Sequence, residues 1–292
     1  MFSSIIMIHI YCDGGLGNRL LTMFSGLFFS KATNKPFVIH WPVNNWCGCN
    51  LGDIYDNKYE ITSLSLKGVS QIIPANCIFL IHSFRGSIKR LSRKKSKAVV
   101  INVELSKSKM LELFNMSSDI LYCGDNLHRS LEINDIRVIV NELAMSENVR
   151  KCISQYDLNG FHGIHIRGTD SPLKPYYTIP QLEDEVRNNI DKKYFVCSDQ
   201  KDIEILFKKY SNVVIFDKSN YVKKIDLSKR WGIKVHNGRQ FNIDRNRLSV
   251  IEAFCDMMLL SKTEIIKTSE SSFLRCAELF SKSLNSARME GK

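Results

Sequence analysis

Residues 161–216 of the sequence are FHGIHIRGTDSPLKPYYTIPQLEDEVRNNIDKKYFVCSDQKDIEILFKKYSNVVIF. Short apolar runs alternate here with longer runs in which apolar residues recur every three or four positions. The short runs predict buried strands, and the longer runs predict amphipathic helices. The predicted strands are Phe161–Ile166, Tyr194–Cys197 and Val213–Phe216, and the predicted helices are Pro180–Ile190 and Lys201–Tyr210. Strands that alternate with helices form βαβ units, so this region predicts a parallel sheet in an α/β fold.

The same alternation extends to both sides of this region. Toward the N-terminus it predicts strands Ile5–Tyr11, Phe37–Trp41, Ile78–Ile81, Ala98–Val103 and Ile120–Cys123, with helices Leu16–Lys31 and Glu132–Tyr156. Toward the C-terminus it predicts helix Leu248–Leu260, strand Glu264–Lys267 and helix Phe273–Phe280. Turn residues at Asp157–Gly160 place a domain boundary between residues 156 and 157. We therefore expect two α/β domains, residues 1–156 and 157–292, with a cleft between them.

The composition is that of a globular protein. Of 292 residues, 44% are hydrophobic and 24% are charged, which argues against disorder and coiled coil. No apolar run reaches the ~20 residues of a membrane span. No basic stretch precedes an apolar block near the N-terminus, so a secretory signal is not expected. The nine cysteines are an odd number, and several lie within apolar runs, which predicts reduced, buried thiols and a cytoplasmic protein.

The charge balance favours anionic partners. Lysine and arginine number 41 against 30 aspartate and glutamate, a net charge of +11. Such a protein attracts nucleotides, nucleic acids, acidic glycans or anionic membranes. The segment Arg85–Lys97 is densely basic and predicts either a solvated loop or a contact with an anionic membrane. Nucleic-acid binding is not expected there, because no aromatic residues interleave with the charges.

Ligands of open parallel sheets lie beyond the carboxyl ends of the strands, so the residues that follow each strand are candidates for a site. The first predicted strand is followed by Asp13-Gly-Gly-Leu-Gly-Asn-Arg19 and then by a helix. Glycines let backbone N–H groups approach a ligand, and a helix N-terminus favours an anion. The segment is neither a P-loop nor a dinucleotide fingerprint. It is therefore either a tight turn or an anion cradle to which Asn18 and Arg19 add polar donors.

The strand Phe161–Ile166 leads into Arg167-Gly168-Thr169-Asp170. Alternation along a strand places His165 and Arg167 on the same face. A guanidinium suits bidentate binding of a phosphate, and Gly168 leaves room for the backbone to approach the same anion. The alternative is a surface ion pair between Arg167 and Asp170 beside a structural histidine.

Serines follow the last predicted strand, at Ser269-Glu-Ser-Ser272. Serine is a preferred cap of a helix N-terminus. The same hydroxyl and N–H groups can hold an anion or a ribose. The segment Ser198-Asp199 and Asp217 follow the two preceding strands of the second domain; they are either turn residues or ligands of a ribose or a base.

Three segments, taken in order, resemble a known family. They are GGLGNR at residues 14–19, HIRGTD at residues 165–170, and DMMLLS at 256–261 followed by TSESSF at 268–273. Their order and spacing resemble the GDP-fucose-dependent fucosyltransferases, especially the α1,6- and nodulation-type enzymes, with protein O-fucosyltransferases and α1,2-fucosyltransferases as more distant relatives. The resemblance implies the GT-B architecture, in which two Rossmann-like domains face each other across a cleft. It also implies inverting, metal-independent transfer.

The resemblance assigns roles to individual residues. Arg167 would bind the donor's β-phosphate and stabilise the charge on departing GDP. His165 would contact the guanosine, and Asp256 would recognise guanine. The remaining donor-binding candidates are Ser271, Ser272, Phe273 and Gly168 in the C-terminal domain, which would hold the nucleotide sugar, and Gly15, Gly17 and Arg19 in the acceptor-side N-terminal domain. Asn18, which would approach the phosphate–fucose junction, is a catalytic candidate together with Arg167 and Asp170.

The sequence also departs from the family pattern. The α1,6-type motif is His-x-Arg-Arg-x-Asp, followed by a lysine and then by an acid that serves as base. Here Gly168 takes the place of the second arginine, Ser171 follows Asp170, and residues 172–175 contain no acid. An inverting transfer needs a group that deprotonates the acceptor hydroxyl. Asp170 is the nearest candidate, with Asp13 and Asp53 as further candidates.

The sequence thus predicts a transferase that moves fucose from GDP-fucose to a hydroxyl of a glycan or glycolipid, with no cofactor or metal besides the donor. One alternative is a glycosyltransferase that uses another nucleotide hexose. A second is a non-catalytic binder of sugar nucleotides or glycans, which the missing second arginine and acid favour. A third is a basic nucleic-acid-binding protein.

Three other segments have open interpretations. Trp41-Pro-Val-Asn-Asn-Trp46 suits either stacking on sugar rings or filling of the N-terminal core. The pair Cys47-Gly-Cys49 lacks the second ligand pair of a zinc site, so two loop cysteines and no metal are expected. The polar stretch Lys218–Arg245, which includes Trp231, is long for a compact domain and is a candidate lid or acceptor loop.

Overall fold

The computed structural model describes residues 6–56, 59–74, 77–81, 100–102, 105–124, 130–168, 175–224, 232–235, 238–241 and 243–290. The chain divides into two compact units. The N-terminal unit comprises Met1–Val43 and Asn50–Ala144, and the C-terminal unit comprises Asn44–Cys49 and Met145–Lys292. The short segment Asn44–Cys49 therefore belongs to the C-terminal unit, although it lies early in the sequence.

The N-terminal unit is built on a parallel sheet. Its strands are β1 (Ile8–Cys12), β2 (Phe37–His40), β4 (Ile61–Thr62), β5 (Ile78–Ile81), β6 (Val100–Asn102) and β7 (Ile120–Gly124). They form six strands in the order β4-β2-β1-β7-β5-β6. The helices are α1 (Leu16–Ala32), α2 (Leu66–Ile72), α4 (Lys107–Phe114) and α5 (Ile133–Glu142), with a 3-10 turn η1 (Leu51–Asp53). A short strand β3 (Tyr55–Asp56) pairs with β8 (Ala144–Met145).

Alternation along β1 sends its side chains to two different layers. Ile10 packs against α1 so closely that a Cβ on Gly26 would lie 2.7 Å from Ile10 Cγ2. Tyr11 instead belongs to a buried cluster that includes Val69 of α2 and Phe79 of β5. Both faces of the sheet are thus covered, as expected for a parallel sheet.

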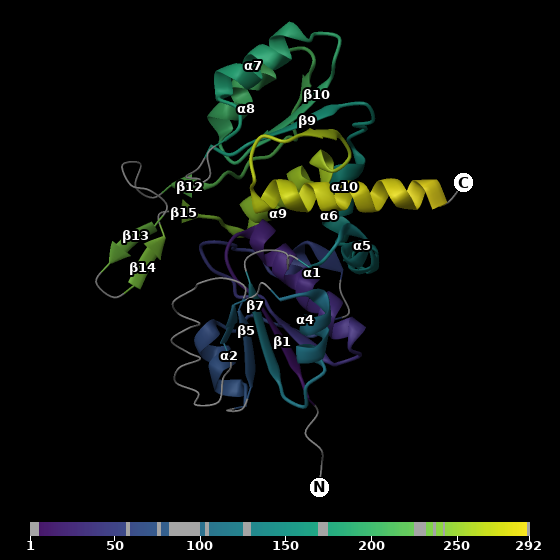
Figure 1. Ribbon diagram of the computed structural model, residues 1–292. Coiled ribbons are helices and arrows are strands. Elements are labelled where there is room, and N and C mark those ends of the chain that lie inside the picture. Colours follow the sequence, from purple (N-terminus) through teal and green to yellow (C-terminus); the bar gives the residue numbers. More distant parts are fainter. Residues whose placement is uncertain are drawn as a thin grey trace. The chain divides into compact units, whose positions relative to one another are not determined.

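The C-terminal unit has its own parallel sheet (Figure 1). Its strands are β9 (His162–Ile166), β10 (Tyr194–Ser198), β11 (Val213–Val214) and β16 (Glu264–Ile266), in the order β11-β10-β9-β16. The helices are α6 (Glu147–Ser154), α7 (Ile179–Asn188), α8 (Lys201–Lys208), α9 (Arg247–Leu260) and α10 (Ser272–Glu290). Two short antiparallel pairs complete it, β12 (Lys223–Lys224) with β15 (Ile243–Asp244) and β13 (Gly232–Val235) with β14 (Gly238–Phe241).

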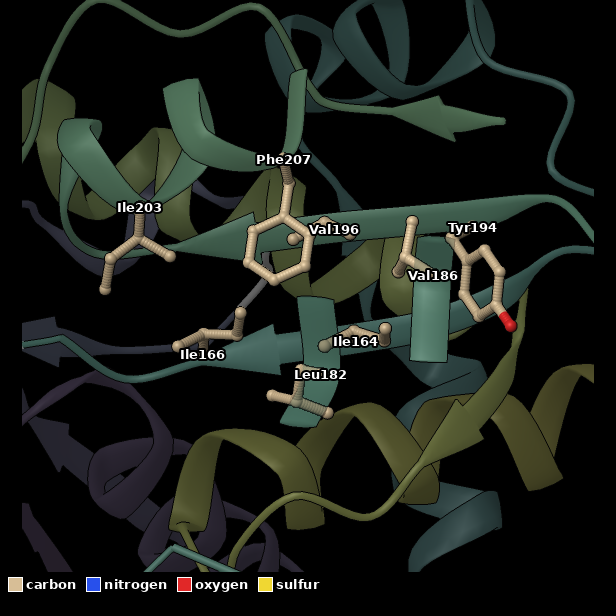
Figure 2. Packing of buried hydrophobic residues seen from close by; sticks show 8 residues of the cluster. All are labelled: Ile164, Ile166, Leu182, Val186, Tyr194, Val196, Ile203 and Phe207. Atoms are coloured by element: carbon tan, nitrogen blue, oxygen red, sulfur yellow. The ribbon is translucent and has the colours of Figure 1, made fainter. Parts of the chain in front are cut away.

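Helices cover both faces of this second sheet as well. Figure 2 shows α7 and α8 packed on one face, where Leu182 and Phe207 meet Ile164 and Val196. The opposite face packs on α9, since a Cβ on Gly163 would lie 2.6 Å from Leu260 Cδ1. Helices α6 and α10 in turn contact α9. The helices thus cover the two faces of the sheet, and a ligand site is expected at the carboxyl ends of its strands.

The predicted α/β class is confirmed, and the elements predicted between residues 161 and 216 agree with the structure to within two residues. The single helix predicted for Glu132–Tyr156 is wrong: it is two helices, α5 and α6, because the backbone turns extended at Leu143. Helices α2 and α4 were not predicted. Each is capped by a serine hydroxyl, Ser65 at 3.3 Å from Gly68 N and Ser106 at 3.3 Å from Lys109 N.

The boundary between the units differs from the predicted one. It lies between Ala144 and Met145 rather than between residues 156 and 157. The reason is that α6 packs against α9, and Lys262 Nζ donates a hydrogen bond to Ile153 O at 3.0 Å. The predicted cleft between the domains stays a prediction.

Several predictions concern segments outside the described residues. These are the basic segment Arg85–Lys97, Asp170 and Trp231. No helix within the described ranges is long and apolar enough to cross a membrane. The nine cysteines all lie within the described ranges; none forms a disulfide, and all except Cys152 are buried.

Candidate functional site

The carboxyl ends of three adjacent strands meet at one edge of the C-terminal sheet. Gly168 follows β9, Asp199 follows β10, and Thr268 follows β16. Hydrogen bonds join these ends: Gly168 N donates to Asp199 Oδ1 at 2.7 Å, and Thr268 Oγ1 donates to His165 O at 2.6 Å. The three loops thus form one continuous rim, at the place where α/β folds bind ligands.

Arg167 is a partly buried cation on this rim, directly after β9. Its guanidinium forms no hydrogen bond or ion pair with another residue that the structure describes. A guanidinium carries five N–H donors in a planar fork. Arg167 is therefore available to an incoming anion as far as the described residues are concerned, and its predicted binding of a phosphate stays a prediction.

A second guanidinium lies close to Arg167. It belongs to Arg245, two residues before α9. Its Nη1 is buried and has no hydrogen-bond partner within the described part of the chain. Burial, and next the positive charge of Arg167, lower the pKa of Arg245 to about 10, although the nearby Asp199 carboxylate acts in the opposite direction. Two guanidinium groups that lie close together in a partly buried position repel each other, and an anion between them would relieve this repulsion.

The segment Asn44–Cys49 holds Arg245 in place. Arg245 N donates to Asn45 O at 3.1 Å, and the guanidinium lies 5.8 Å from the centre of the Trp46 ring. Gly48 packs so tightly that a Cβ there would lie 2.4 Å from Arg245 O. Trp46 thus makes a cation–π contact with an arginine. Sequence reasoning did not identify Arg245, because the residues that position it lie about two hundred positions earlier.

His165 forms the apolar side of the rim. Its ring stacks on Phe273 of α10, with centroids 4.3 Å apart and planes 18° apart. Burial, helped by the charges of Arg167 and Lys218, lowers the pKa of His165 to about 4, so the imidazole is neutral at pH 7. Its buried Nδ1 has no hydrogen-bond partner among the residues described. A buried polar atom of this kind is costly unless a ligand or water satisfies it.

The serine loop caps α10. The Ser271 hydroxyl is buried and accepts a hydrogen bond from Leu274 N at 3.2 Å. This is the capping role considered for the segment. Ser272 and Phe273 are partly exposed at the start of the helix. They remain candidates for ligand contact.

The prediction for Gly168 needs correction. Its N–H is already bonded to Asp199, so it is not offered to a ligand. A Cβ at this position would lie 2.5 Å from Gln200 Oε1 and 2.6 Å from Ile203 Cδ1. The absence of a side chain at residue 168 is therefore a packing requirement.

Asp256 belongs to a buried ionic cluster behind the rim. Lys218 Nζ lies 2.6 Å from Glu204 Oε1 and also contacts Asp256 Oδ2. It donates to Ser198 O at 2.6 Å as well, while Tyr221 donates to Glu204 Oε2 at 2.6 Å. The single ammonium of Lys218 thus faces two carboxylates. Burial and the negative charge of Glu204 raise the pKa of Asp256 to about 7, although the ammonium of Lys218 acts in the opposite direction.

This cluster changes the interpretation of Asp256. The residue is 3% exposed, and one of its carboxylate oxygens is engaged by Lys218. Its Oδ1 is buried and unpartnered among the described residues. Guanine recognition by Asp256 stays a prediction. In the structure, the Asp256 carboxylate pairs with the buried ammonium of Lys218.

The glycine loop of the N-terminal unit is held by Arg19. Arg19 is 0% exposed; its Nε donates to Gly14 O at 2.7 Å, and its Nη1 donates to Pro42 O at 2.5 Å. Its guanidinium also lies 5.3 Å from the centre of the Trp41 ring. The prediction that Arg19 binds the donor is therefore corrected: Arg19 positions the loop. Trp41 is 1% exposed, so it fills the core.

The predicted approach of the rest of this loop to a ligand stays a prediction. Gly14 has φ 91°, a conformation that favours glycine. A Cβ added at Gly15 would meet nothing within 4 Å, so the loop backbone faces open space there. Asn18 is partly exposed, while Gly17 is buried in α1. The carboxylates of Asp13 and Asp53 bind backbone N–H groups of Gly14 and Asn50, at 2.7 and 2.8 Å.

The C-terminal unit thus brings together most of the residues predicted for it, including the strand-end candidate Asp199, and adds Arg245. The residues gathered at this rim are His165, Arg167, Gly168, Ser271, Ser272 and Phe273. Among the described residues, no group of three or more His, Cys, Asp or Glu side chains is arranged to hold a metal ion.

Comparison with solved structures shows the same architecture in other proteins. NodZ alpha-1,6-fucosyltransferase soaked with GDP-fucose superposes with a TM-score of 0.57 at 18% identity, over 94% of this chain and 92% of that one. The fold is shared with solved fucosyltransferases. Fucosyltransferase NodZ from Bradyrhizobium gives a TM-score of 0.54 at 15% identity, over 94% of this chain and 93% of that one.

A plant protein shows the fold again. A variant of Arabidopsis thaliana FUT1 in complex with GDP gives a TM-score of 0.52 at 11% identity, over 95% of this chain and 69% of that one. At these identities the likeness concerns the fold. No protein-family model and no curated protein matches the sequence.

Proposed function

We propose that this protein is a glycosyltransferase that moves fucose from GDP-fucose to a hydroxyl of a glycan. The observation that carries the proposal is the guanidinium of Arg167 at the carboxyl end of β9, which bonds to no other residue that the structure describes. The neutral, buried His165 lies beside it, and its Nδ1 has no hydrogen-bond partner within the described ranges. A diphosphate with an attached base needs these two features, a cation for the anion and a dry polar contact for the nucleoside.

The shared fold supports the same choice of donor. Of the structures compared above, NodZ was soaked with GDP-fucose and the FUT1 variant is in complex with GDP. GDP-fucose is therefore the donor to test first. Another nucleotide hexose is the first alternative.

The proposed transfer is a displacement at the anomeric carbon, and the positive charge of Arg167 assists it. The bond between the anomeric carbon and the β-phosphate oxygen breaks, and its electron pair stays on GDP. The acceptor oxygen forms the new bond to the anomeric carbon from the opposite side, which inverts the configuration, and its proton passes to a base. Arg167 stabilises the charge that develops on the departing diphosphate. The counter-charge comes from a guanidinium, so we expect transfer without a metal ion.

The remaining assignments come from the sequence. Asp170 is the candidate base for the acceptor proton, and the glycine loop is the candidate contact with the phosphate–fucose junction. We propose a glycan or glycolipid as acceptor and a cytoplasmic location. The basic segment Arg85–Lys97 is proposed to contact an anionic membrane.

Transfer to a glycan panel tests the proposal. Wild type is incubated with GDP-fucose and acceptors, with and without EDTA, and fucosylated product and GDP are measured. Arg167→Met is expected to lower the rate by about 100- to 1,000-fold, the usual effect of losing one group that stabilises transition-state charge. Arg187→Met is the matched control, because Arg187 is 59% exposed and pairs only at the surface with Asp184.

The outcomes separate the alternatives. Turnover with GDP-mannose or a UDP-sugar instead of GDP-fucose identifies another donor. Saturable GDP binding with no turnover on any acceptor favours a non-catalytic binder. Binding of random oligonucleotides that GDP does not compete with, and that salt weakens steeply, favours a nucleic-acid-binding protein.

A further inference from the structure

Arg245 has the features of a ligand-binding arginine rather than a structural one. Structural arginines satisfy their N–H groups, as Arg19 does with two backbone carbonyls. Arg245 instead has a buried Nη1 with no partner in the described part of the chain, and its nearest positive neighbour is Arg167. Burying a cation next to another cation is unfavourable. The arrangement is explained if both guanidinium groups serve an anion that arrives later.

We propose that Arg245 is the second diphosphate-binding cation of the donor site, paired with Arg167 across the rim. This inference rests on the proposed function, because the diphosphate is that of the nucleotide sugar. It extends that function to a residue from a different part of the chain, and it assigns a role to the segment Asn44–Cys49.

The packing around residue 168 explains why the second cation comes from elsewhere. A side chain at 168 would collide with Gln200 and Ile203, and the Gly168 N–H is tied to Asp199. The strand end therefore offers one arginine only. A second guanidinium must approach from another element, and the loop before α9 supplies it.

The segment Asn44–Cys49 then acts as the support of Arg245. The Trp46 ring lies 5.8 Å from the guanidinium, and Asn45 O fixes the backbone N–H of Arg245 at 3.1 Å. Gly48 allows this approach, since a Cβ there would lie 2.4 Å from Arg245 O. These contacts restrict the side chain and leave Nη1 without a hydrogen-bond partner among the residues that the structure describes. A preorganised cation of this kind lowers the entropic cost of binding an anion.

Calorimetric titration of the full chain tests the proposal with GDP, guanosine and inorganic diphosphate. Arg245→Met is expected to weaken GDP binding about 10- to 100-fold, the effect of losing a charge-assisted hydrogen bond. Guanosine binding should change less than about twofold, because that probe has no phosphate. Arg187→Met controls for net charge, and Arg167→Met should match Arg245→Met. The melting temperature of the ligand-free Arg245→Met protein is expected to equal or exceed that of wild type, because a repulsive pair is removed.

Each of the following results would overturn the inference. One is GDP binding by Arg245→Met equal to that of Arg187→Met while Arg167→Met loses affinity; the proposed function then survives. Another is equal loss of GDP and guanosine binding by Arg245→Met, which indicates a collapsed site. If Arg245→Met does not fold, Arg245→Gln takes its place, and GDP binding by that variant equal to that of Arg187→Met overturns the inference. Absence of GDP binding by wild type overturns the proposed function and the inference together.

Discussion

Replacing Lys218 with Met is expected to destabilise the C-terminal unit by about 3–5 kcal/mol, the usual effect of removing one partner of a buried ion pair. The Lys218 side chain is 4% exposed, and its Nζ lies 2.6 Å from Glu204 Oε1 and contacts Asp256 Oδ2. Without the ammonium, two buried carboxylates face each other with no cation between them. The least costly response is uptake of a proton by one of them.

Proton uptake makes this loss depend on pH. In the variant the folded state binds a proton at a higher pH than the unfolded state does, so stability falls as pH rises through the raised pKa of the carboxyl pair. The deficit relative to wild type should therefore be larger at pH 8 than at pH 5. Burial already raises the pKa of Asp256 to about 7 in the wild-type protein, which places the change within this interval.

Urea unfolding at pH 5 and pH 8 measures the effect. A loss of 3–5 kcal/mol corresponds to a melting temperature lower by about 6–20 °C for a chain of this size. Lys209→Met is the matched control, because Lys209 pairs with Glu183 at 2.7 Å but is 53% exposed. Surface pairs contribute little. Equal small losses for both variants, or a Lys218→Met deficit that does not change with pH, would refute this account of the cluster.

Three further predictions concern single positions. Burial lowers the pKa of His40 to about 4. The folded state therefore binds a proton less readily than the unfolded state, and the free energy of unfolding should fall by on the order of 3 kcal/mol as the pH falls from 6.5 to 4. Urea titrations should show a shallower fall for His40→Gln. Gly168→Ala should destabilise by about 1–3 kcal/mol through overpacking, and Gln200→Ala should restore part of this loss; no restoration would contradict the contact. Gly14→Ala should cost about 1–2 kcal/mol in thermal melts because of its positive φ, whereas Gly15→Ala should leave stability unchanged; equal effects would argue against the observed loop geometry.

Local patterns were sufficient for the elements of the C-terminal sheet. Apolar runs such as Tyr194–Cys197 and helical spacing such as Lys201–Tyr210 depend on neighbours a few residues away, and the structure places both within two residues of the prediction. The position of Arg167 at a strand end follows from the same alternation. Parallel pairing also followed, because each strand is separated from the next by a helix.

Elements without a strong apolar period were harder to predict. Helix α4 spans only eight residues, too few to show a clear apolar period, and the signal that could have identified it is the capping serine, Ser106. The break between α5 and α6 lies within continuous helical spacing, so the pattern alone joined them. The boundary at residue 144 depends on packing of α6 against α9, which no local pattern contains.

The amino-acid sequence alone determined the alternation of strands and helices, the parallel sheets and the residues at the strand ends, because these follow from short-range periodicity and chain connectivity. Only the tertiary structure decided which polar side chains are satisfied. It assigned Arg19 to backbone carbonyls, Lys218 to two carboxylates and Arg245 to the Trp46 ring beside Arg167. Burial and hydrogen bonding depend on residues that are far apart in the sequence and meet only when the sheets and helices pack.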